Sequence, residues 1–406
     1  MKILVSAYAC EPGKGSEPGV GWSFVNELAK KHNVTVLTRK NNKDNILNSN
    51  EIWVTNVQWL FFDPPKYLTF WKRKGFGVQL FYIIWQISAL KYIKKNLKNL
   101  SPDCIHHITF GKYWVPTFLG KTGIPTFFGP VGGGDTTPPC FKKSYSISGK
   151  TKENIKNLFS YLIPRLPLFK SAYNHITLSF AATKETASKL SKFVDISTIE
   201  IIPQSGLNQE QLIALENISN STQKENYPLF VTACRLEHWK AVHLAIKAFK
   251  NILQDYPNAR LEVIGDGPEK RNLIDLANRL QISNNITFIN RLDTLEEVYT
   301  EIAKSTALLH PALHEAFGQV CVEAQALGTP VICWDWGGPG IITENNGTAV
   351  PVKDTEEESI SSFSEKMIEV IKSPPPKPLF NKKLLWENIV LQLTDKIISH
   401  KFNNLK

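Results

Sequence analysis

The second half of the chain carries two cations whose types and spacing suit the binding of an anion. Arg235 and Lys240 follow an apolar strand, Leu229 to Ala233, and precede a predicted helix that begins at Ala241. Two permanent cations beside a helix N-terminus can neutralise a diphosphate and stabilise the charge that grows as the diphosphate leaves. Solvated surface charge is the usual fate of Lys and Arg, so both interpretations stay open.

Two carboxylates, Glu315 and Glu323, lie in one stretch from His310 to Trp336. We expect Glu315 in a loop, and Glu323 two turns along a helix that opens on Phe317-Gly318 and carries almost no other charge. A carboxylate taken out of water needs hydrogen-bond donors or cations around it. For Glu323 these partners are either an internal Arg or Lys, or the hydroxyl groups of a bound ligand.

A glycine-rich loop, E-P-G-K-G-S-E-P-G-V-G-W, follows the first strand and leads into a predicted helix, Trp22 to Lys31. One of its glycines is Gly19. The loop does not end in the G-K-[ST] of a phosphate-binding Walker loop. A plain strand-to-helix turn needs fewer glycines, so a ligand contact and a simple turn are both open interpretations.

A second loop, Gly129 to Asp135, contains three consecutive glycines, Gly132, Gly133 and Gly134. Each glycine costs on the order of 1 kcal/mol against alanine in ordered structure. Either something approaches this backbone closely or the backbone needs a positive φ. We favour the close approach of a substrate.

Two adjacent histidines, His106 and His107, lie at the end of a predicted strand from Cys104 to Ile108. Adjacent side chains on a strand point to opposite faces, so at most one of the two can face a crevice. A histidine at a strand end can act as a catalyst, but it is more often a hydrogen-bonded core residue.

Short apolar strands alternate with helical patterns along the chain, six in the first half and five in the second, which indicates parallel α/β sheets. An aperiodic connector within residues 203–226 separates the two halves. We therefore predict two Rossmann-like domains, residues 1–205 and 206–380, followed by a C-terminal helix in residues 381–406. In open parallel sheets ligands gather at the carboxyl ends of the strands, where the residues above are expected.

Length and composition are those of a soluble two-domain protein. The 406 residues are 42% hydrophobic and carry a formal net charge of +10, which fits a phosphate-bearing substrate, an anionic membrane surface or nucleic acid and does not choose among them. Nucleic acid is not expected, because no recognised nucleic-acid module is present and acidic residues would line the groove. The six cysteines include no C-x-x-C pair. That indicates a reducing cytoplasm and argues against structural zinc.

The segment Phe61 to Lys98 mixes aromatic residues with Lys and Arg. One interpretation is that part of it, above all the loop Pro64 to Phe76, lies on an anionic membrane surface. The other is that Val78 to Leu97 is an ordinary Rossmann helix with a basic last turn. No run of about 18 apolar residues is present, so no membrane span is expected. The expected location is cytoplasmic, with peripheral contact to the inner face of the cytoplasmic membrane under the first interpretation.

In this order, the motifs resemble the retaining glycosyltransferases of family 4. The resemblance rests on the Arg235/Lys240 pair, the turn G-D-G-P that begins at Gly265, and H-P-A-L-H-E-A-F-G-Q-V-C-V-E-A-Q-A-L-G-T-P-V-I, which contains the family's E-x7-E motif. The openings Y-A-C-E-P-G-K-G-S-E-P-G-V-G-W and G-P-V-G-G-G further resemble a bacterial subgroup linked to surface-polysaccharide assembly. The resemblance covers nearly the whole chain.

The resemblance implies the GT-B fold, in which two Rossmann-like domains with parallel sheets face a central cleft. The acceptor would bind the first domain and a nucleotide-sugar the second, and the C-terminal helix, residues 381–406, would cross back onto the first domain. Glu323 would hold the ribose hydroxyls and Glu315 the hydroxyls of the transferred sugar, while Arg235 and Lys240 would neutralise the departing diphosphate. His106 would stand near the sugar, with His107 as the alternative.

The catalytic residues implied are therefore His106, Arg235, Lys240 and Glu315. The implied substrate-binding residues are Gly19, Gly132, Gly133, Gly134, Arg235, Lys240, Gly265, Ala316, Phe317, Gly318 and Glu323. Among them, Phe317 and Gly318 would contribute backbone N–H groups.

The implied function is transfer of a hexose from a nucleotide-diphosphate sugar to a glycan or lipid-linked acceptor in cell-surface polysaccharide biosynthesis, with retention of anomeric configuration. No cofactor and no metal is expected, and the sequence contains no D-x-D motif. The implied mechanism is front-face displacement, in which the leaving phosphate helps to deprotonate the acceptor hydroxyl. The alternatives are a catalytically inactive sugar- or nucleotide-binding protein of the same fold and a nucleotide-sugar epimerase.

The chain departs from the family pattern at three positions. Ala316 replaces the usual glycine of E-G-F-G, Ala241 replaces the glycine after the lysine, and Leu292 stands where a glycine is common. An added methyl group at position 316 could narrow the sugar pocket or change the loop. The charged groups are left intact.

Overall fold

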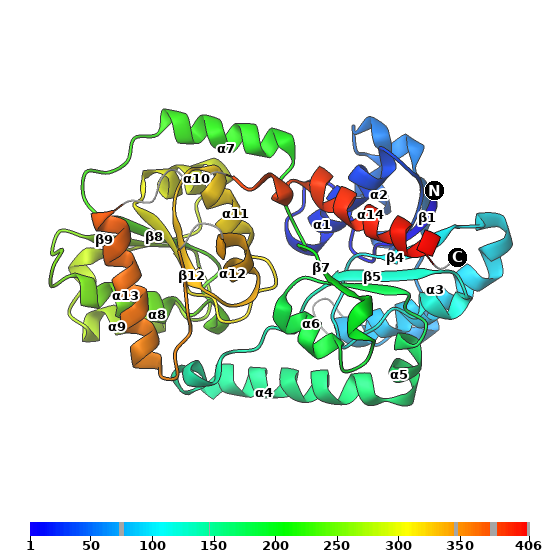
Figure 1. Ribbon diagram of the computed structural model, residues 1–406, viewed down its shortest axis with the longest axis horizontal. Coiled ribbons are helices and arrows are strands. Elements are labelled where there is room, and N and C mark those ends of the chain that lie inside the picture. The colour runs from blue at the N-terminus through cyan, green and yellow to red at the C-terminus, as the bar shows by residue number, and fades with distance from the viewer. Residues whose placement is uncertain (73–76, 146, 345–347, 374–379, 404–406) are drawn as a thin grey trace. The chain divides into compact units, whose positions relative to one another are not determined.

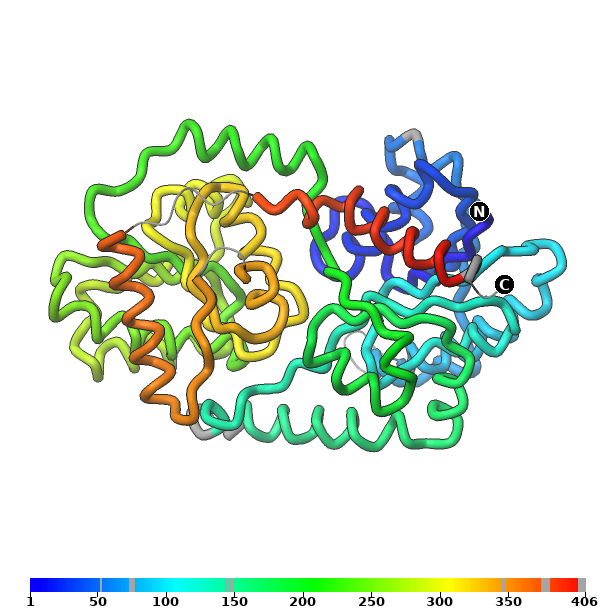
Figure 2. Tube along the Cα trace, viewed as in Figure 1, coloured from blue at the N-terminus to red at the C-terminus, as the bar shows by residue number. Residues whose placement is uncertain are grey.

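The computed structural model describes residues 1–72, 77–145, 147–344, 348–373 and 380–403. They fold into two compact units, whose course along the chain can be followed in Figures 1 and 2. Unit 1 comprises Met1–Gly134, Asn157–Ser205 and the C-terminal segment from Trp386. Unit 2 comprises Asp135–Lys156 and Gly206–Leu385.

Unit 1 is built on a parallel sheet of seven strands in the order β3-β2-β1-β4-β5-β6-β7. The strands are β1 (Lys2–Ser6), β2 (Asn33–Thr38), β3 (Gln58–Phe61), β4 (Cys104–His107), β5 (Thr126–Val131), β6 (Leu178–Ala181) and β7 (Ile199–Ile201). The sequence predicted the first six and missed β7. This strand has only three residues and none of them is fully buried, so it lacks a strong apolar signal.

The helices of unit 1 include a long one, α3, that the sequence offered as a membrane-surface candidate. They are α1 (Ser16–Ala29), α2 (Lys43–Leu47), α3 (Val78–Leu100), α5 (Pro167–Tyr173), α6 (Lys184–Leu190) and α14 (Trp386–Asn403). In α3 the aromatic side chains of Phe81, Tyr82 and Trp85 are buried in the core of the unit. Their burial supports the interpretation of α3 as an ordinary Rossmann helix.

The last helix packs on unit 1. The ring of Trp386 lies 5.2 Å from the ring of Phe24 in α1, and apolar residues further along α14 join the same core. Figure 2 shows the red C-terminal helix beside the blue N-terminal segments. The helix begins at Trp386 rather than at Asn381, because Lys382–Leu384 form a 3-10 turn instead.

Unit 2 contains a parallel sheet of six strands in the order β10-β9-β8-β11-β12-β13. The strands are β8 (Leu229–Ala233), β9 (Arg260–Ile264), β10 (Ile286–Ile289), β11 (Ala307–His310), β12 (Val331–Trp334) and β13 (Ala349–Val350). The helices are α7 (Gln209–Ser221), α8 (Val242–Ile252), α9 (Lys270–Arg279), α10 (Leu295–Lys304), α11 (Gln319–Ala326), α12 (Gly337–Thr343) and α13 (Glu356–Lys372). The two-residue strand β13 was not predicted. The two parallel sheets confirm the predicted α/β class.

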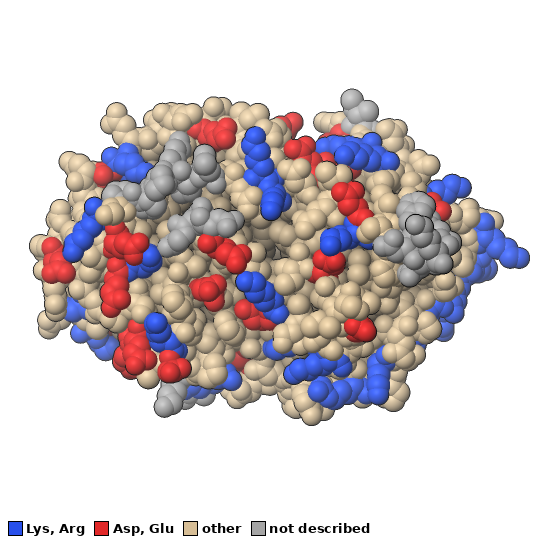
Figure 3. All heavy atoms as spheres, in the orientation of Figure 1, with Lys and Arg blue, Asp and Glu red and all other residues tan. Residues whose placement is uncertain are grey.

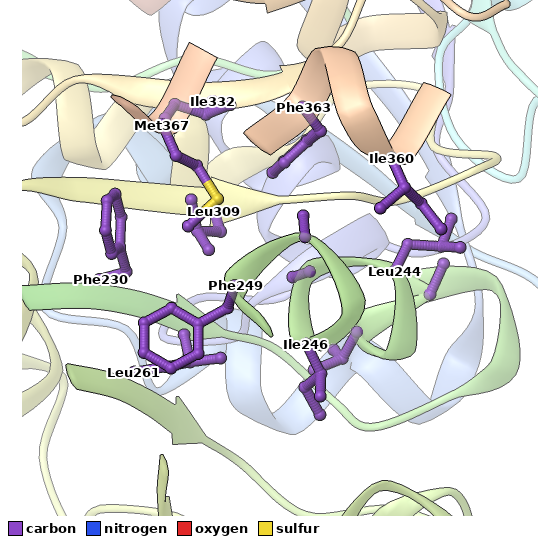
Figure 4. Close-up of a cluster of buried hydrophobic side chains, with 14 of the residues drawn as sticks. Phe230, Leu244, Ile246, Phe249, Leu261, Leu309, Ile332, Ile360, Phe363 and Met367 are labelled. Carbon is purple, nitrogen blue, oxygen red and sulfur yellow. The ribbon is translucent and has the colours of Figure 1, made fainter. Parts of the chain in front are cut away.

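The core of unit 2 lies between the sheet and helices α8 and α13. Figure 4 shows Phe230 and Leu309 from the sheet facing Phe249 of α8 and Met367 of α13. All four side chains are fully buried. This packing fixes α8 on the sheet, and α8 is the helix that follows the predicted cation pair.

Two segments differ from the predicted domain plan. Part of the predicted connector forms the end of α7, which begins with a capping box between Asn208 and Gln211. The segment Asp135–Lys156 belongs to unit 2, although it lies within the predicted first domain. Phe141 is the physical reason, because its buried ring packs 5.0 Å from that of Trp334.

Helix α4 (Ile147–Leu162) spans the boundary between the two units. Within the residues that the model covers, we find no helix that is both long and apolar enough to cross a membrane.

Candidate functional site

Lys240 and Glu315 form an ion pair in unit 2. Lys240 ends a 3-10 turn, η8 (His238–Lys240), that follows β8, and Glu315 lies in the loop after β11. The Lys240 Nζ atom lies 2.5 Å from Glu315 Oε2, and the two side chains are 17% and 21% exposed. Because β8 and β11 are neighbours in a parallel sheet, the loops at their carboxyl ends meet at one edge.

Backbone hydrogen bonds hold the two loops in register. The Leu313 N–H donates to the carbonyl of Trp239 over 2.9 Å, which ties the loop after β11 to η8. The Gly338 N–H donates to the carbonyl of Glu315 over 2.8 Å, which ties the same loop to the start of α12. The carboxylate of Glu315 is therefore carried on a backbone that is fixed from both sides.

His310 completes this group, and the sequence analysis did not single it out. It is the last residue of β11, it is buried, and its Nε2 atom lies 2.8 Å from Glu315 Oε2. Burial alone would raise the pKa of Glu315, but the Lys240 ammonium and the hydrogen bond with His310 together lower it. Burial likewise works against the charge of Lys240, and Glu315 more than offsets it, so that the pKa of Lys240 is raised. Both residues are charged at neutral pH.

Glu323 lies on α11 and is partly exposed. Its partners are the hydroxyl of Tyr299 and the side chain of Gln319, not the internal Arg or Lys that the sequence offered as one interpretation. Burial raises the pKa of Glu323, and these two hydrogen bonds offset only part of that effect. The carboxylate is thus less well stabilised than an ordinary surface glutamate.

The start of α11 differs from the prediction by two residues. The helix begins at Gln319, and Gly318 precedes it with φ of +88°, a conformation that favours glycine. Phe317 is buried, with its ring in the unit 2 core. The backbone of Ala316 does not have a positive φ. The methyl group in place of glycine therefore creates no backbone strain.

Ala241, in contrast, does have a strained backbone conformation. Its φ is +50° at the point where η8 passes into α8, in the left-handed region that glycine occupies most easily. A left-handed conformation costs a residue with a Cβ about 1–2 kcal/mol. A glycine at position 241 would adopt this conformation without that cost.

Arg235 does not join the Lys240–Glu315 pair in this structure. Its side chain is 75% exposed and its Nε atom lies 3.0 Å from Glu237 Oε1. The high exposure of Arg235 agrees with one of the two interpretations that the sequence left open, that of a solvated surface charge. Gly265 is also engaged within the protein, because its N–H donates to the Ile289 carbonyl and a Cβ there would lie 2.0 Å from the Cys234 carbonyl oxygen.

Two of the predicted substrate-binding glycines of unit 1, Gly19 and Gly134, lie against the protein's own backbone. Helix α1 begins at Ser16, so Gly19 lies inside it, where a Cβ would lie 2.2 Å from the Lys14 carbonyl oxygen. At Gly134 a Cβ would meet the Thr186 backbone at 2.3 Å, so the protein's own helix α6 makes the close approach that we assigned to a substrate.

The other two glycines of that loop differ from each other. The Gly132 N–H donates to the Gly111 carbonyl. Gly133 has a φ of +85°, and a Cβ there would be 3.8 Å from its nearest neighbour, Trp114. A Cβ at Gly133 would thus make only an ordinary van der Waals contact, whereas one at Gly134 would clash with the Thr186 backbone.

His106 and His107 lie on opposite faces of the sheet, as predicted, and both are fully buried. His106 Nε2 lies 2.7 Å from the Gly129 carbonyl oxygen, and His107 Nε2 lies 2.8 Å from the Tyr82 hydroxyl. Burial lowers the pKa of His106 to about 4 and that of His107 to about 3. These contacts and the burial agree with the interpretation of both histidines as hydrogen-bonded core residues, which the sequence left open. The catalytic role that the resemblance implies for His106 stays a prediction.

Comparison with known proteins finds similarity to glycosyltransferases. Residues 215–382, which include Lys240, Glu315 and Glu323, match the family described as Glycosyl transferases group 1. An uncharacterized glycosyltransferase of Methanocaldococcus jannaschii, MJ1059, is 24% identical over 278 residues, which cover 62% of this chain and 61% of that relative. The chain thus spans less than two thirds of that relative's length. The family match and the relative's name support a glycosyltransferase.

Solved structures show the same fold. The lipopolysaccharide outer core galactosyltransferase WaaB superposes with a TM-score of 0.65 over 98% of this chain and 99% of WaaB, at 13% identity. Anabaena HepE, solved with UDP and glucose, superposes with a TM-score of 0.55 over 98% of this chain and all of HepE, at 16% identity. At these identities the likeness concerns the fold, which is that of the GT-B glycosyltransferases.

Proposed function

We propose that this protein is a retaining glycosyltransferase that moves a hexose from a nucleotide-diphosphate sugar to a glycan or lipid-linked acceptor in cell-surface polysaccharide biosynthesis. The observation that carries the proposal is the Lys240–Glu315–His310 group at the carboxyl ends of β8 and β11, with Glu323 on the helix that follows. HepE, a protein of the same fold, was solved with UDP and glucose, which supports a nucleotide-sugar as the donor.

In this proposal Lys240 exchanges partners when the donor binds. Its ammonium would turn from Glu315 toward the diphosphate and stabilise the negative charge that develops there as the sugar–phosphate bond breaks. Glu315, held ionised, would accept hydrogen bonds from hydroxyls of the transferred sugar. His310 would keep its hydrogen bond to Glu315 and so preserve the position of the carboxylate.

Glu323 would bind the ribose. A carboxylate with only a phenol and an amide as partners has lone pairs left for two neighbouring hydroxyls. The proposed mechanism is front-face displacement, in which the leaving phosphate takes the proton of the acceptor hydroxyl. It uses no cofactor and needs no metal at the diphosphate.

A transfer assay tests this function. The full chain would be incubated with UDP-, GDP- and ADP-linked hexoses and with glycan or lipid-linked acceptors, and the released nucleoside diphosphate and the anomeric configuration of the product would be measured. We expect release that depends on the acceptor and a product with the donor's configuration. An inverted product, or no release with any donor in a well-folded sample, would refute the proposal.

We also propose that the protein meets an anionic membrane surface, where a lipid-linked acceptor would lie. The loop predicted for this contact does expose aromatic side chains, Tyr67 at 73% and Phe70 at 84%. The basic residues Arg73 and Lys74 and the loop end at Phe76 lie outside the described residues. On the face drawn in Figure 3, basic and acidic side chains are otherwise interspersed.

A second apolar surface in unit 1, on the end of α4 and on α5, was missed by the sequence analysis. Its large side chains are between 45% and 58% exposed; they are Leu158, Phe159, Tyr161, Leu162, Leu166 and Leu168. Within unit 1, the stretch 157–173 carries two cations, Arg165 and Lys170, and no carboxylate. An exposed apolar strip flanked by cations matches the interface of an anionic bilayer, where each cation contributes about 1 kcal/mol.

The membrane contact is tested by binding to vesicles of anionic and of zwitterionic lipid. We expect the wild-type chain to bind anionic vesicles, and the double variant L158E/L162E to lose at least about tenfold in affinity, since it places two carboxylates on the apolar strip. A Tyr67→Glu/Phe70→Glu variant reports on the loop separately. The matched control is Ile213→Glu, which changes an equally exposed residue of α7 in unit 2. Unchanged binding by L158E/L162E would rule out the α4–α5 surface.

A further inference from the structure

Three potential metal ligands from distant parts of the sequence meet in unit 2. Glu153 of α4, His238 of η8 and His314 of the loop after β11 each present one ligand atom, and these atoms all lie within 4.8 Å of one another. Glu153 and His238 are 6% and 7% exposed. The Glu153 Oε2 and His314 Nε2 atoms are 3.4 Å apart, which is long for a hydrogen bond between a carboxylate and an imidazole.

Two of the polar atoms in this cluster lack hydrogen-bond partners. Glu153 Oε1 and His314 Nε2 are buried and accept or donate no hydrogen bond. Buried polar atoms without a partner are rare in folded proteins, and each one calls for a physical reason. A bound cation between the three side chains would supply one.

Aromatic neighbours hold the two imidazoles in place. The His314 ring stacks on Trp239 at a centroid distance of 5.5 Å, and the His238 ring meets the edge of Tyr145 at 5.0 Å. A Cβ at Gly149 would lie 3.2 Å from the His238 ring, so this glycine lets α4 approach the histidine closely. The ligand set is thus oriented before any ion arrives, as a metal site requires.

We propose that Glu153, His238 and His314 bind a divalent transition metal, with Zn²⁺ as the ion that fits this ligand set best. Two imidazoles and one carboxylate are a known zinc ligand set, which leaves a fourth position for water. Zinc bonds of about 2.0–2.2 Å require the three side chains to close by roughly 1 Å from their present separation. The site uses no cysteine, so the cysteine spacing that argued against structural zinc does not bear on it.

The proposed ion would have a structural role: it would link parts of the chain to one another and would not contact the substrate. His238 stands two residues before Lys240, and His314 directly precedes Glu315. A metal bound to both histidines and to Glu153 would join α4 to the two loops that carry the Lys240–Glu315 pair. The proposal is independent of the proposed function, because it needs only the three ligands.

One neighbouring group opposes the ion. The Lys156 Nζ atom lies 3.7 Å from Glu153 Oε1, and its positive charge would repel a bound cation. This makes Lys156→Met an informative variant. It removes the repulsion if a metal binds, and it only deletes an ion pair if none does.

The test is metal binding by the full chain after treatment with a chelator. Zn²⁺ would be titrated against a competing chromophoric chelator, and Co²⁺ would be added separately to read the visible absorption of a four-coordinate site. We expect one equivalent per chain and a higher midpoint of thermal unfolding with Zn²⁺. We expect H238A and H314A each to weaken binding by more than the 10–100-fold that loss of an outer-shell partner costs, and K156M to strengthen it.

Two control variants test whether the metal is bound by these three residues and not by cysteines. C140S/C234S removes the partly exposed thiols, the other candidate zinc ligands near the surface, and should bind like wild type. Glu153→Gln removes one ligand charge with little change of shape, so it reports on the site if an alanine variant fails to fold. Zinc binding that survives both H238A and Glu153→Gln, or no cobalt absorption in the wild-type chain, would overturn the proposal.

Discussion

Replacing Lys240 with methionine is expected to lower kcat/KM for the donor on the order of 10²–10³-fold, because the charge that develops on the leaving diphosphate loses its nearest cation. The same change leaves the Glu315 carboxylate with His310 as its remaining close partner. We expect the free energy of unfolding to fall by about 1–3 kcal/mol, between the values for exposed and fully buried pairs. Initial rates and chemical denaturation measure the two quantities.

The double variant K240M/E315Q is the matched control for this prediction. It removes both charges, so no carboxylate is left without its cation, and we expect it to recover most of the lost stability. Activity should stay low, because neither the diphosphate nor the sugar regains its partner. If the double variant recovers activity together with stability, the pair is structural and the catalytic role of Lys240 is wrong.

The second large effect is expected at Glu323. Glu323→Gln should weaken the binding of the donor's nucleoside diphosphate by about 10–100-fold, the cost of lost hydrogen bonds to a charged group. Its stability should be unchanged or slightly higher. Burial raises the pKa of Glu323, so the folded state favours the neutral form and a neutral amide relieves that cost. Calorimetric titration measures the nucleotide affinity, and chemical denaturation measures the free energy of unfolding.

The raised pKa of Glu323 also predicts how nucleotide binding depends on pH. Because the pKa of Glu323 is raised, the carboxylate takes up its proton at a higher pH than an ordinary glutamate. Nucleotide affinity in the wild-type chain should therefore fall as the pH decreases, starting above the pH range in which an ordinary glutamate titrates, and the glutamine variant should lack this step. Tyr299→Phe is the control, since it removes a neighbour of the carboxylate but keeps the carboxylate itself. Equal affinity of wild type and Glu323→Gln would remove Glu323 from the donor site.

The fold and the location of Lys240 and Glu315 could be predicted because they rest on strong, local signals, but their ion pair was not predicted. Buried parallel strands appear as short apolar runs, and residues just after two of them must share one edge of the sheet. Lys240 follows β8 and Glu315 follows β11, so their meeting depends only on those two strands being neighbours. The resemblance to known glycosyltransferases led to the same residues.

The partners of these groups could not be predicted, because they come from elements without distinctive sequence signals. Tyr299 lies on α10, one helix away from Glu323, and nothing in its neighbourhood separates it from a packing residue. His310 could have been found, since it ends a buried strand five residues before Glu315. Glu153 could not, because only the burial of Phe141 and Tyr145 shows that its segment folds with unit 2.

The roles of the glycines and of His106 could not be decided from the sequence for a related reason. A run such as Gly132, Gly133 and Gly134 indicates close approach but does not say what approaches. In the structure, Thr186 of the same unit occupies that place at Gly134. A histidine at the end of a central strand is equally ambiguous. Full burial of His106 becomes visible only when Phe24 and Phe180 are seen around its ring.

The most direct test of the central claim, a nucleotide-sugar site around Lys240, Glu315 and Glu323, is thermal unfolding of the full chain with UDP, GDP, ADP and CMP. A nucleotide at about 100 times its Kd should stabilise the wild-type fold by about 2.7 kcal/mol. We predict that at least one diphosphate raises the unfolding midpoint, and that Glu323→Gln reduces this rise. No shift with any of the four nucleotides in a well-folded sample, or the same shift in Glu323→Gln, would contradict the claim.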